Sequence, residues 1–205
     1  MLKLFYALST CALASHIALE EAQAEYEAIR LDFRANDQTK PEYLAINPKA
    51  RVPALITEQG VLTETPAILA YIAQTHPQAR LAPLADAYAF ARIQAFNSYL
   101  CSTVHVAHAH GRRGYRWADD PAAIKDMQRK VPETVAACFE LIEREMIAGP
   151  WVTGQDYSIC DPYLFTMTRW LEGDSVDVAR FPRVHDHFKR MSGRAAVKKV
   201  LAVQS

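Results

Sequence analysis

The chain has 205 residues and carries 23 Lys and Arg against 23 Asp and Glu, so its formal net charge is zero. Half of the residues are hydrophobic and 22% are charged, which is typical of a globular protein and excludes disordered, collagen-like and membrane-embedded chains. A neutral chain has no overall field that attracts polyanions, so we expect neither nucleic acid nor a membrane as a partner.

The first 77 residues alternate strand-like and helix-like patterns. Ser9-Thr10 and Thr65-Pro66 can begin helices, because these residue types are favoured at helix N-termini. Gln59-Gly60 is typical of a hairpin turn. In chain order, the patterns predict a strand at 2–5, a helix at 12–24, a strand at 29–33, one helical turn between 41 and 48, a hairpin at 52–56 and 61–62, and a helix at 65–75.

The apolar run over residues 4–14 also has the outline of a signal peptide. Ser9 and Thr10 interrupt this run, and Lys3 is the one positive charge that precedes it. We therefore favour a strand, a loop and a helix of the folded protein. No segment approaches the roughly 20 continuous apolar residues that a membrane span requires.

Beyond residue 77 the sequence becomes helical throughout. Prolines at 77 and 83 indicate a linker, and Pro132 predicts a kink inside a long helix. The predicted helices cover residues 85–110, 121–148, 158–171, 182–191 and 194–203. We therefore expect an α/β domain over 1–77, a linker over 78–86 and an all-helical domain over 87–205.

The four cysteines are scattered and include no C-x-x-C pair, which predicts neither a disulfide framework nor a zinc finger and suits a reducing cytoplasm. Cys11 stands where the first strand turns into a helix, and free N–H groups at a helix start favour an anion. A thiol in such a place can have a lowered pKa and react as a thiolate. A free cysteine can equally be a small buried hydrophobic residue, and position alone leaves both interpretations open.

Two further segments have features of a binding site. The main chain of Val52, before Pro53 at a strand start, could pair with an extended peptide, although an edge-strand proline without a ligand is the simpler interpretation. Thr65 at a helix start could hold a carboxylate, and Glu64 beside it could pair with an ammonium group. Together these two suit an α-amino acid group, whereas plain helix capping is the alternative.

These elements together resemble the glutathione S-transferase superfamily, and in particular its bacterial beta class. The order and spacing of the motifs make this resemblance more specific than any one of them, and it covers nearly the whole chain. The matching segments are Lys3-Leu4-Phe5-Tyr6 leading to Cys11, His16-Ile17-Ala18-Leu19, Asn47 to Leu55, Leu62-Thr63-Glu64-Thr65, and the helix-capping box Ser158-Ile159-Cys160-Asp161.

The resemblance implies a thioredoxin-like domain followed by an all-helical one, with glutathione as co-substrate and a two-fold dimer as the assembly. It places Cys11 beside the glutathione sulfur and Tyr6 where many other classes keep an activating tyrosine. It also implies main-chain pairing of the cysteinyl unit to Val52 beside a cis Pro53. The γ-glutamyl contacts would come from Glu64 and Thr65, and a contact reaching over from the helical domain would come from His105.

The sequence departs from the beta-class pattern in two places. Ser9 and Thr10 precede Cys11 where the class often has Ser-Pro-Gly-Ala, so either hydroxyl could donate to a thiolate. Arg51 replaces a frequent glutamine and adds a cation where a glutathione carboxylate could lie.

The helix predicted over 85–110 carries a second group of polar residues. Cys101, His105 and His108 share one helix face, but a single helix would supply every ligand, so we expect no metal. Near its end, Arg112, Arg113 and Arg116 form a cluster that could steer an anionic substrate, with His108 beside them at the electrophile site. A solvated helix end is the alternative.

We therefore expect a cytoplasmic, detoxifying glutathione transferase that conjugates glutathione to a small hydrophobic electrophile, with an anionic one left open. The helical domain would supply the apolar wall for that electrophile. One alternative is a glutathione-dependent thiol-disulfide reductase that uses Cys11 as nucleophile. Another is a non-catalytic glutathione-binding regulatory protein, because a fold alone does not secure an activity.

Overall fold

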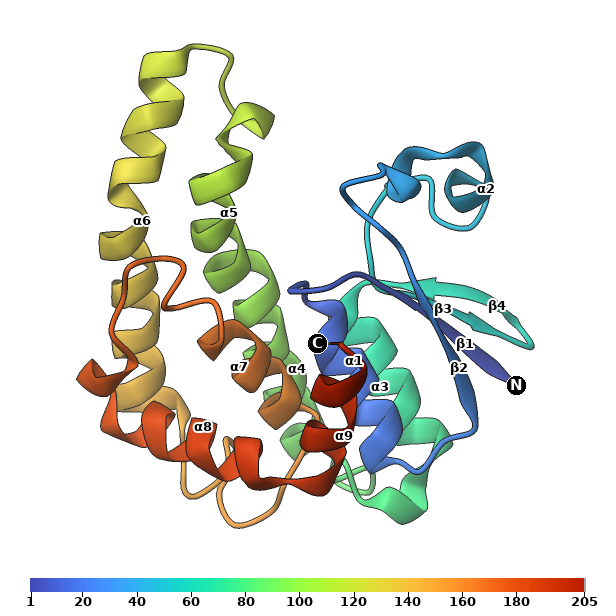
Figure 1. The fold of residues 1–205 in the computed structure, drawn as a ribbon. Helices are drawn as coiled ribbons and strands as arrows, with labels where there is room; N and C mark the ends of the chain where they lie inside the picture. The colour runs from blue at the N-terminus through green and yellow to red at the C-terminus, as the bar shows by residue number, and fades with distance from the viewer. Residues whose placement is uncertain (205) are drawn as a thin grey trace.

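The computed structural model describes residues 1–204 and contains one four-stranded sheet with helices on both of its faces (Figure 1). The strand order is β2-β1-β3-β4, with β1 parallel to β2 and the other neighbours antiparallel. The elements up to residue 75 are β1 (Leu2–Tyr6), α1 (Ala12–Glu21), β2 (Tyr26–Arg30), α2 (Pro41–Leu44), β3 (Ala54–Thr57), β4 (Gly60–Thr63) and α3 (Thr65–Thr75). This mixed sheet confirms the expected thioredoxin-like architecture.

The remaining chain is helical, as predicted. Its helices are α4 (Ala87–Tyr99), α5 (His105–Arg113), α6 (Pro121–Leu141), α7 (Cys160–Thr168), α8 (Pro182–Gly193) and α9 (Ala195–Val203). α6 continues unbroken through Pro132. No helix among residues 1–204 is long and apolar enough to cross a membrane. The division into domains at 78–86 stays a prediction.

Two of the predicted elements differ from the structure. The strand predicted at 29–33 is present but lies three residues earlier, because β2 spans Tyr26–Arg30 and the next residues form a turn. The Asp32 carboxylate accepts a hydrogen bond from the Arg34 N–H at 2.8 Å and closes that turn, which leaves Phe33 exposed. The long helix predicted at 85–110 is interrupted by a π-helical turn over Leu100–Val104, which joins α4 to α5.

Buried apolar residues on each side of the sheet fix the positions of the helices. Leu4 and Leu55 face α1 and α3, and this core continues without a break into the helical region through residues such as Phe139. On the opposite face, Phe5 packs against Tyr43 of α2 with ring centroids 5.5 Å apart. The sheet and the helical region therefore pack as one body, with α1 in contact with α7.

The predicted capping box at the start of α7 is formed. The Asp161 carboxylate accepts hydrogen bonds from the N–H groups of Ser158 at 2.7 Å and Val152 at 2.9 Å, and it pairs with His187 Nε2 at 3.0 Å. All of this lies in the interior, since Asp161 has no exposed surface. The box therefore fixes the loop before α7, and with it the packing of α7 on α1.

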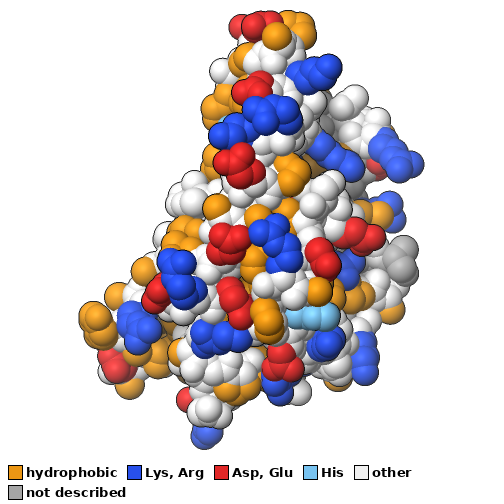
Figure 2. Space-filling model, turned by 90° about the vertical axis from the view of Figure 1, so that its left-hand side faces the viewer, with side chains coloured by type: hydrophobic (Ala, Val, Ile, Leu, Met, Phe, Trp, Pro, Cys, Tyr) orange, Lys and Arg blue, Asp and Glu red, His pale blue; other side chains and the backbone are white. Residues whose placement is uncertain are grey.

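On the face shown in Figure 2, basic and acidic side chains are interspersed with apolar ones. This distribution matches the zero net charge of the chain. A cluster of three arginines lines the pocket beside Cys11, which is described next.

Candidate functional site

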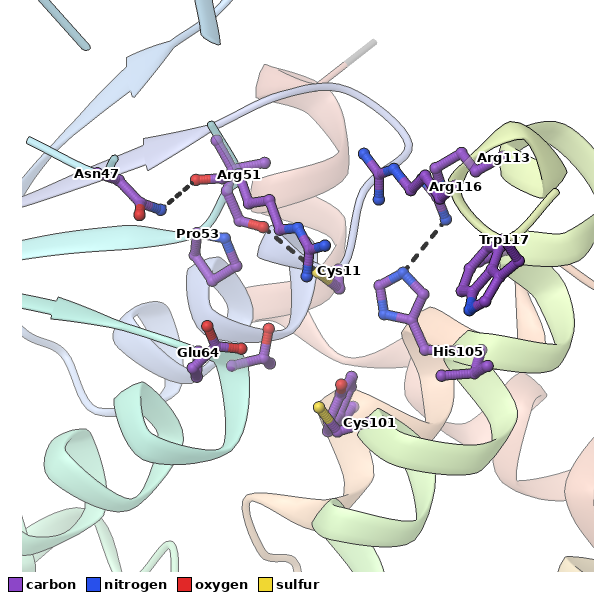
Figure 3. Close-up of a pocket in the computed structure, with 15 residues that line it drawn as sticks. Cys11, Asn47, Arg51, Pro53, Glu64, Cys101, His105, Arg113, Arg116 and Trp117 are labelled. Atoms are coloured by element: carbon purple, nitrogen blue, oxygen red, sulfur yellow. Dashed lines mark hydrogen bonds between the residues drawn. The ribbon is translucent and has the colours of Figure 1, made fainter. Parts of the chain in front are cut away.

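A pocket of about 290 Å³ lies between the sheet region and α5 (Figure 3). Nine of its lining residues are among those singled out from the sequence: Cys11, Arg51, Val52, Pro53, Glu64, Thr65, His105, Arg113 and Arg116. Six more were not assigned to a site from the sequence: Asn47, Cys101, Val106, Ala109, Trp117 and Tyr163. The pocket thus combines one wall from the sheet region with one from the helical region.

Cys11 lies at the N-terminus of α1 and faces this pocket from a buried position. Its Sγ donates to the main-chain oxygen of Val52 over 3.6 Å. Burial raises the pKa of the Cys11 thiol, although the Thr65 side chain and the charge of Arg113 act in the opposite direction. Cys11 therefore rests as a thiol that can donate a hydrogen bond, and not as the thiolate that the helix start alone suggests.

The loop that precedes β3 is held by hydrogen bonds from the sheet region. Asn47 Nδ2 and the Tyr43 hydroxyl each donate to the main-chain oxygen of Arg51 at 2.6 Å. The Val52-Pro53 peptide bond is cis, as the resemblance implied. This anchoring presents the main chain of Val52 to the pocket directly above Cys11.

Glu64 and Thr65 form the corner where β4 meets α3. Glu64 has a φ of 71°, in the left-handed region, and its carboxylate is ion-paired with Lys49 in an exposed setting. Thr65 is buried and begins α3 without a side-chain cap at that helix start, so the predicted capping role of Thr65 is wrong. Its side chain contacts the Cys11 and Tyr163 side chains instead.

His105 forms the centre of the opposite wall. The Nε2 atom of His105 lies 3.3 Å from Nη2 of Arg113, and the imidazole ring packs edge-on against Trp170 with ring centroids 5.0 Å apart. Burial, reinforced by the charge of Arg113, lowers the pKa of His105 to about 3. The imidazole is therefore neutral near pH 7 and accepts the arginine's hydrogen bond.

Five residues singled out from the sequence do not line the pocket. Tyr6 is buried against the His16 ring with centroids 5.2 Å apart, and Ser9 is exposed with a φ of 58°. The Thr10 hydroxyl donates to the Ala7 oxygen at 2.7 Å and does not cap α1. His108 pairs with Asp174 at 2.8 Å and stacks on Trp170, and Arg112 is exposed. We therefore leave these five out of the chemistry proposed below.

The polar face of α5 does not gather metal ligands. Because His108 turns to Asp174, Cys101, His105 and His108 do not converge on one point. Within residues 1–204, no three His, Cys, Asp or Glu side chains are arranged to hold a metal ion.

Comparison with known proteins gives consistent results over the whole chain. The family model "Glutathione S-transferase, N-terminal domain" matches residues 1–74. A glutathione transferase homolog from Sulfitobacter, crystallised with bound glutathione, is 46% identical with a TM-score of 0.96, over 99% of this chain and 98% of the other. A beta-class glutathione S-transferase from Sphingomonas chungbukensis is 30% identical with a TM-score of 0.86, over 99% and 98%.

Curated relatives have lower identity and similar coverage. The glutathione S-transferase GstA of Escherichia coli O157:H7 is 28% identical over 99% of this chain and 98% of its own length. The disulfide-bond oxidoreductase YfcG of Escherichia coli is 25% identical over 98% and 94%. These two relatives are therefore named for different thiol chemistries, one for glutathione transfer and the other for disulfide-bond oxidoreduction.

Proposed function

Since this chain belongs to the glutathione S-transferase superfamily, we propose that it binds glutathione in the pocket beside Cys11 and transfers the glutathione thiolate to a small hydrophobic electrophile. The observation that carries this proposal is the position of Cys11. Its buried S–H faces the pocket at the point where the main chain of Val52 is presented.

Glutathione offers three polar parts, and the sheet wall has a partner for each. Glu64 and Thr65 suit the ammonium and carboxylate of the γ-glutamyl end, because they place an anion beside a helix start. The main chain of Val52 suits the cysteinyl peptide unit. Arg51 suits the glycine carboxylate, because a guanidinium can bind a carboxylate through two parallel hydrogen bonds.

The chemical step requires an ionised glutathione thiol, which is mostly protonated when free at neutral pH. A buried S–H at Cys11 can donate to the bound thiolate in place of the Val52 oxygen, and the positive charge of Arg113 favours the same anion. The thiolate then attacks the electrophilic carbon, and the new C–S bond forms as the leaving group departs. His105 is neutral and bonded to Arg113, so its part is to position that arginine.

A glutathione-dependent reductase is the second candidate, since Cys11 faces the pocket and a relative is named a disulfide-bond oxidoreductase. The raised pKa of Cys11 argues against it, because the thiolate is the attacking form in thiol–disulfide exchange. Cys11→Ala separates the two functions. Exchange would vanish in this variant, whereas conjugation would be slowed and would persist.

We also propose a two-fold dimer and a cytoplasmic location, with the domain division at 78–86. Val61 on β4 and Tyr88 on α4 are exposed apolar side chains that are available to a subunit contact. Sedimentation at the mass of a single chain would contradict the dimer.

Calorimetric titration with glutathione, followed by a conjugation assay with 1-chloro-2,4-dinitrobenzene, tests the proposed function. We expect saturable heat and enzymatic turnover, and we expect Glu64→Gln to weaken the binding. Heat without turnover over a panel of electrophiles would favour the non-catalytic alternative. The absence of both heat and turnover would contradict glutathione binding itself.

A further inference from the structure

Three guanidinium groups converge on the pocket from its two walls. Arg51 extends from the sheet wall, while Arg113 and Arg116 project from the end of α5 and the turn after it (Figure 3). Burial first, and then the charges of Arg116 and Arg51, lower the pKa of Arg113. The pocket is therefore locally basic in a chain of zero net charge.

No carboxylate in the described part of the chain neutralises this cluster. None of the three arginines forms an ion pair within residues 1–204, and the one acidic residue that lines the pocket, Glu64, is paired with Lys49. Arg113 Nε is buried without a hydrogen-bond partner, and Arg113 Nη2 meets only the neutral His105. Arg113 is half-buried, whereas Arg51 and Arg116 are exposed beside it. A half-buried cation without a charged partner is costly, so the position of Arg113 indicates a site for an anion.

The wall on which Arg113 stands differs from the wall assigned to glutathione. Val106, Ala109 and Trp117 line the pocket beside it, and all of them come from α5 and the segment that follows. An apolar surface next to a guanidinium suits a molecule with a hydrophobic ring and a carboxylate. Arg51, on the opposite wall, stays available for the glycine carboxylate of glutathione.

We propose that Arg113 and Arg116 bind a carboxylate on the electrophile, so that the preferred substrates are apolar, carboxylate-bearing electrophiles. This inference rests on the proposed conjugation of glutathione and names the substrate class of that same site. The carboxylate takes no part in the bond changes. With an aryl chloride, the thiolate forms the C–S bond, the C–Cl bond breaks, chloride leaves with the electron pair, and the thiol proton passes to solvent.

The test compares 4-chloro-3,5-dinitrobenzoate with its amide, which has the same leaving group and no charge. Each enzymatic kcat/KM is divided by the rate constant of the uncatalysed reaction with glutathione, which removes the difference in intrinsic reactivity. We expect this ratio to favour the carboxylate by about tenfold to a hundredfold, the range typical of a charge-assisted hydrogen-bonded pair. Arg113→Gln together with Arg116→Gln should abolish the preference.

Arg112→Gln is the matched control, because it removes the same charge from the same helix end at an exposed position outside the pocket. It should keep the preference. A thermal melt checks the folding of Arg113→Gln alone, and we expect no loss of stability because a poorly partnered cation is removed. A preference that survives in the double variant, or equal ratios for the two substrates in the unaltered protein, would overturn the proposal.

Direct binding keeps the two proposals distinguishable. Calorimetry with unreactive 3,5-dinitrobenzoate and 3,5-dinitrobenzamide needs no turnover. If the protein binds the benzoate through Arg113 but does not bind glutathione, the proposed function fails and the anion site stands. If glutathione binds but the benzoate and the amide bind equally, the anion site fails alone. A rise in glutathione KM in the double variant, with the anion preference unchanged, would assign the arginines to glutathione and overturn the inference.

Discussion

Replacement of Cys11 by alanine removes the S–H group that faces the glutathione site. This group donates to the Val52 oxygen over 3.6 Å, and burial raises the pKa of the thiol. A thiol whose pKa is raised above its usual range stays protonated near pH 7, so Cys11 is available as a donor. Loss of that donor should therefore make the bound glutathione thiol a weaker acid.

The size of this effect follows from one hydrogen bond to a charged acceptor. Such a bond contributes about 1.5–3 kcal/mol, and one pKa unit corresponds to about 1.36 kcal/mol. Cys11→Ala should therefore raise the pKa of bound glutathione by about 1–2 units. Below that pKa, turnover at saturating substrates follows the thiolate fraction and should fall by about tenfold to a hundredfold.

The assay is the ultraviolet absorbance of the thiolate in the binary complex, titrated against pH, beside the pH profile of kcat. Cys11→Ser keeps a donor at the same position and should restore most of the acidity. Cys138→Ala removes a buried thiol away from the pocket and should leave the titration unchanged. An unaltered glutathione pKa in Cys11→Ala, or equal behaviour of the Ala and Ser variants, would refute the donor role.

Three further outcomes follow from the same structure. Asp161→Ala leaves two buried N–H groups without their acceptor and should lower the free energy of unfolding by about 2–6 kcal/mol in chemical denaturation, whereas Asp156→Ala at an exposed site should have little effect. Burial lowers the pKa of His105 to about 3 and that of His16 to about 4, whereas a histidine in the unfolded chain has a pKa near 6.5. Protonation therefore favours the unfolded chain, so the free energy of unfolding is highest above about pH 6.5 and decreases as the pH falls toward 4. Stability that stays constant from pH 6.5 to 4 would contradict this. Glu64→Gln should weaken glutathione binding by about tenfold in calorimetry through loss of the ammonium contact, while an affinity equal to that of the unaltered protein would place the γ-glutamyl end elsewhere.

The sequence predicts the fold well where local signals and packing agree. Thr65-Pro66 begins α3 as predicted, and the capping box of Ser158 to Asp161 forms before α7. Both predictions succeed because each depends on interactions between neighbouring residues alone. The strand predicted at 29–33 is misplaced because the alternation of apolar and polar residues continues to residue 33, whereas the strand itself ends before the turn at Asp32. Strand pairing decides that end, since β1 pairs with β2 only as far as Arg30.

The candidate site is predictable on one wall and much less so on the other. The sheet wall follows the motif residues around Val52 and Glu64. Which side chains of α5 face the pocket depends on the rotation of that helix about its axis. The π turn at Leu100–Val104 changes this rotation, and no local sequence pattern predicts such a turn. Tyr163 has the pattern of a core aromatic residue and is indeed buried, yet it also lines the pocket.

A structure of the protein with bound glutathione tests the central claim most directly, through the distance from the glutathione sulfur to Cys11 Sγ. The account predicts a hydrogen bond of less than about 4 Å between these two sulfurs, with the cysteinyl main chain on Val52 and the γ-glutamyl end at Glu64 and Thr65. A sulfur that instead lies nearest Tyr6, Ser9 or Thr10, or glutathione bound outside this pocket, would contradict it.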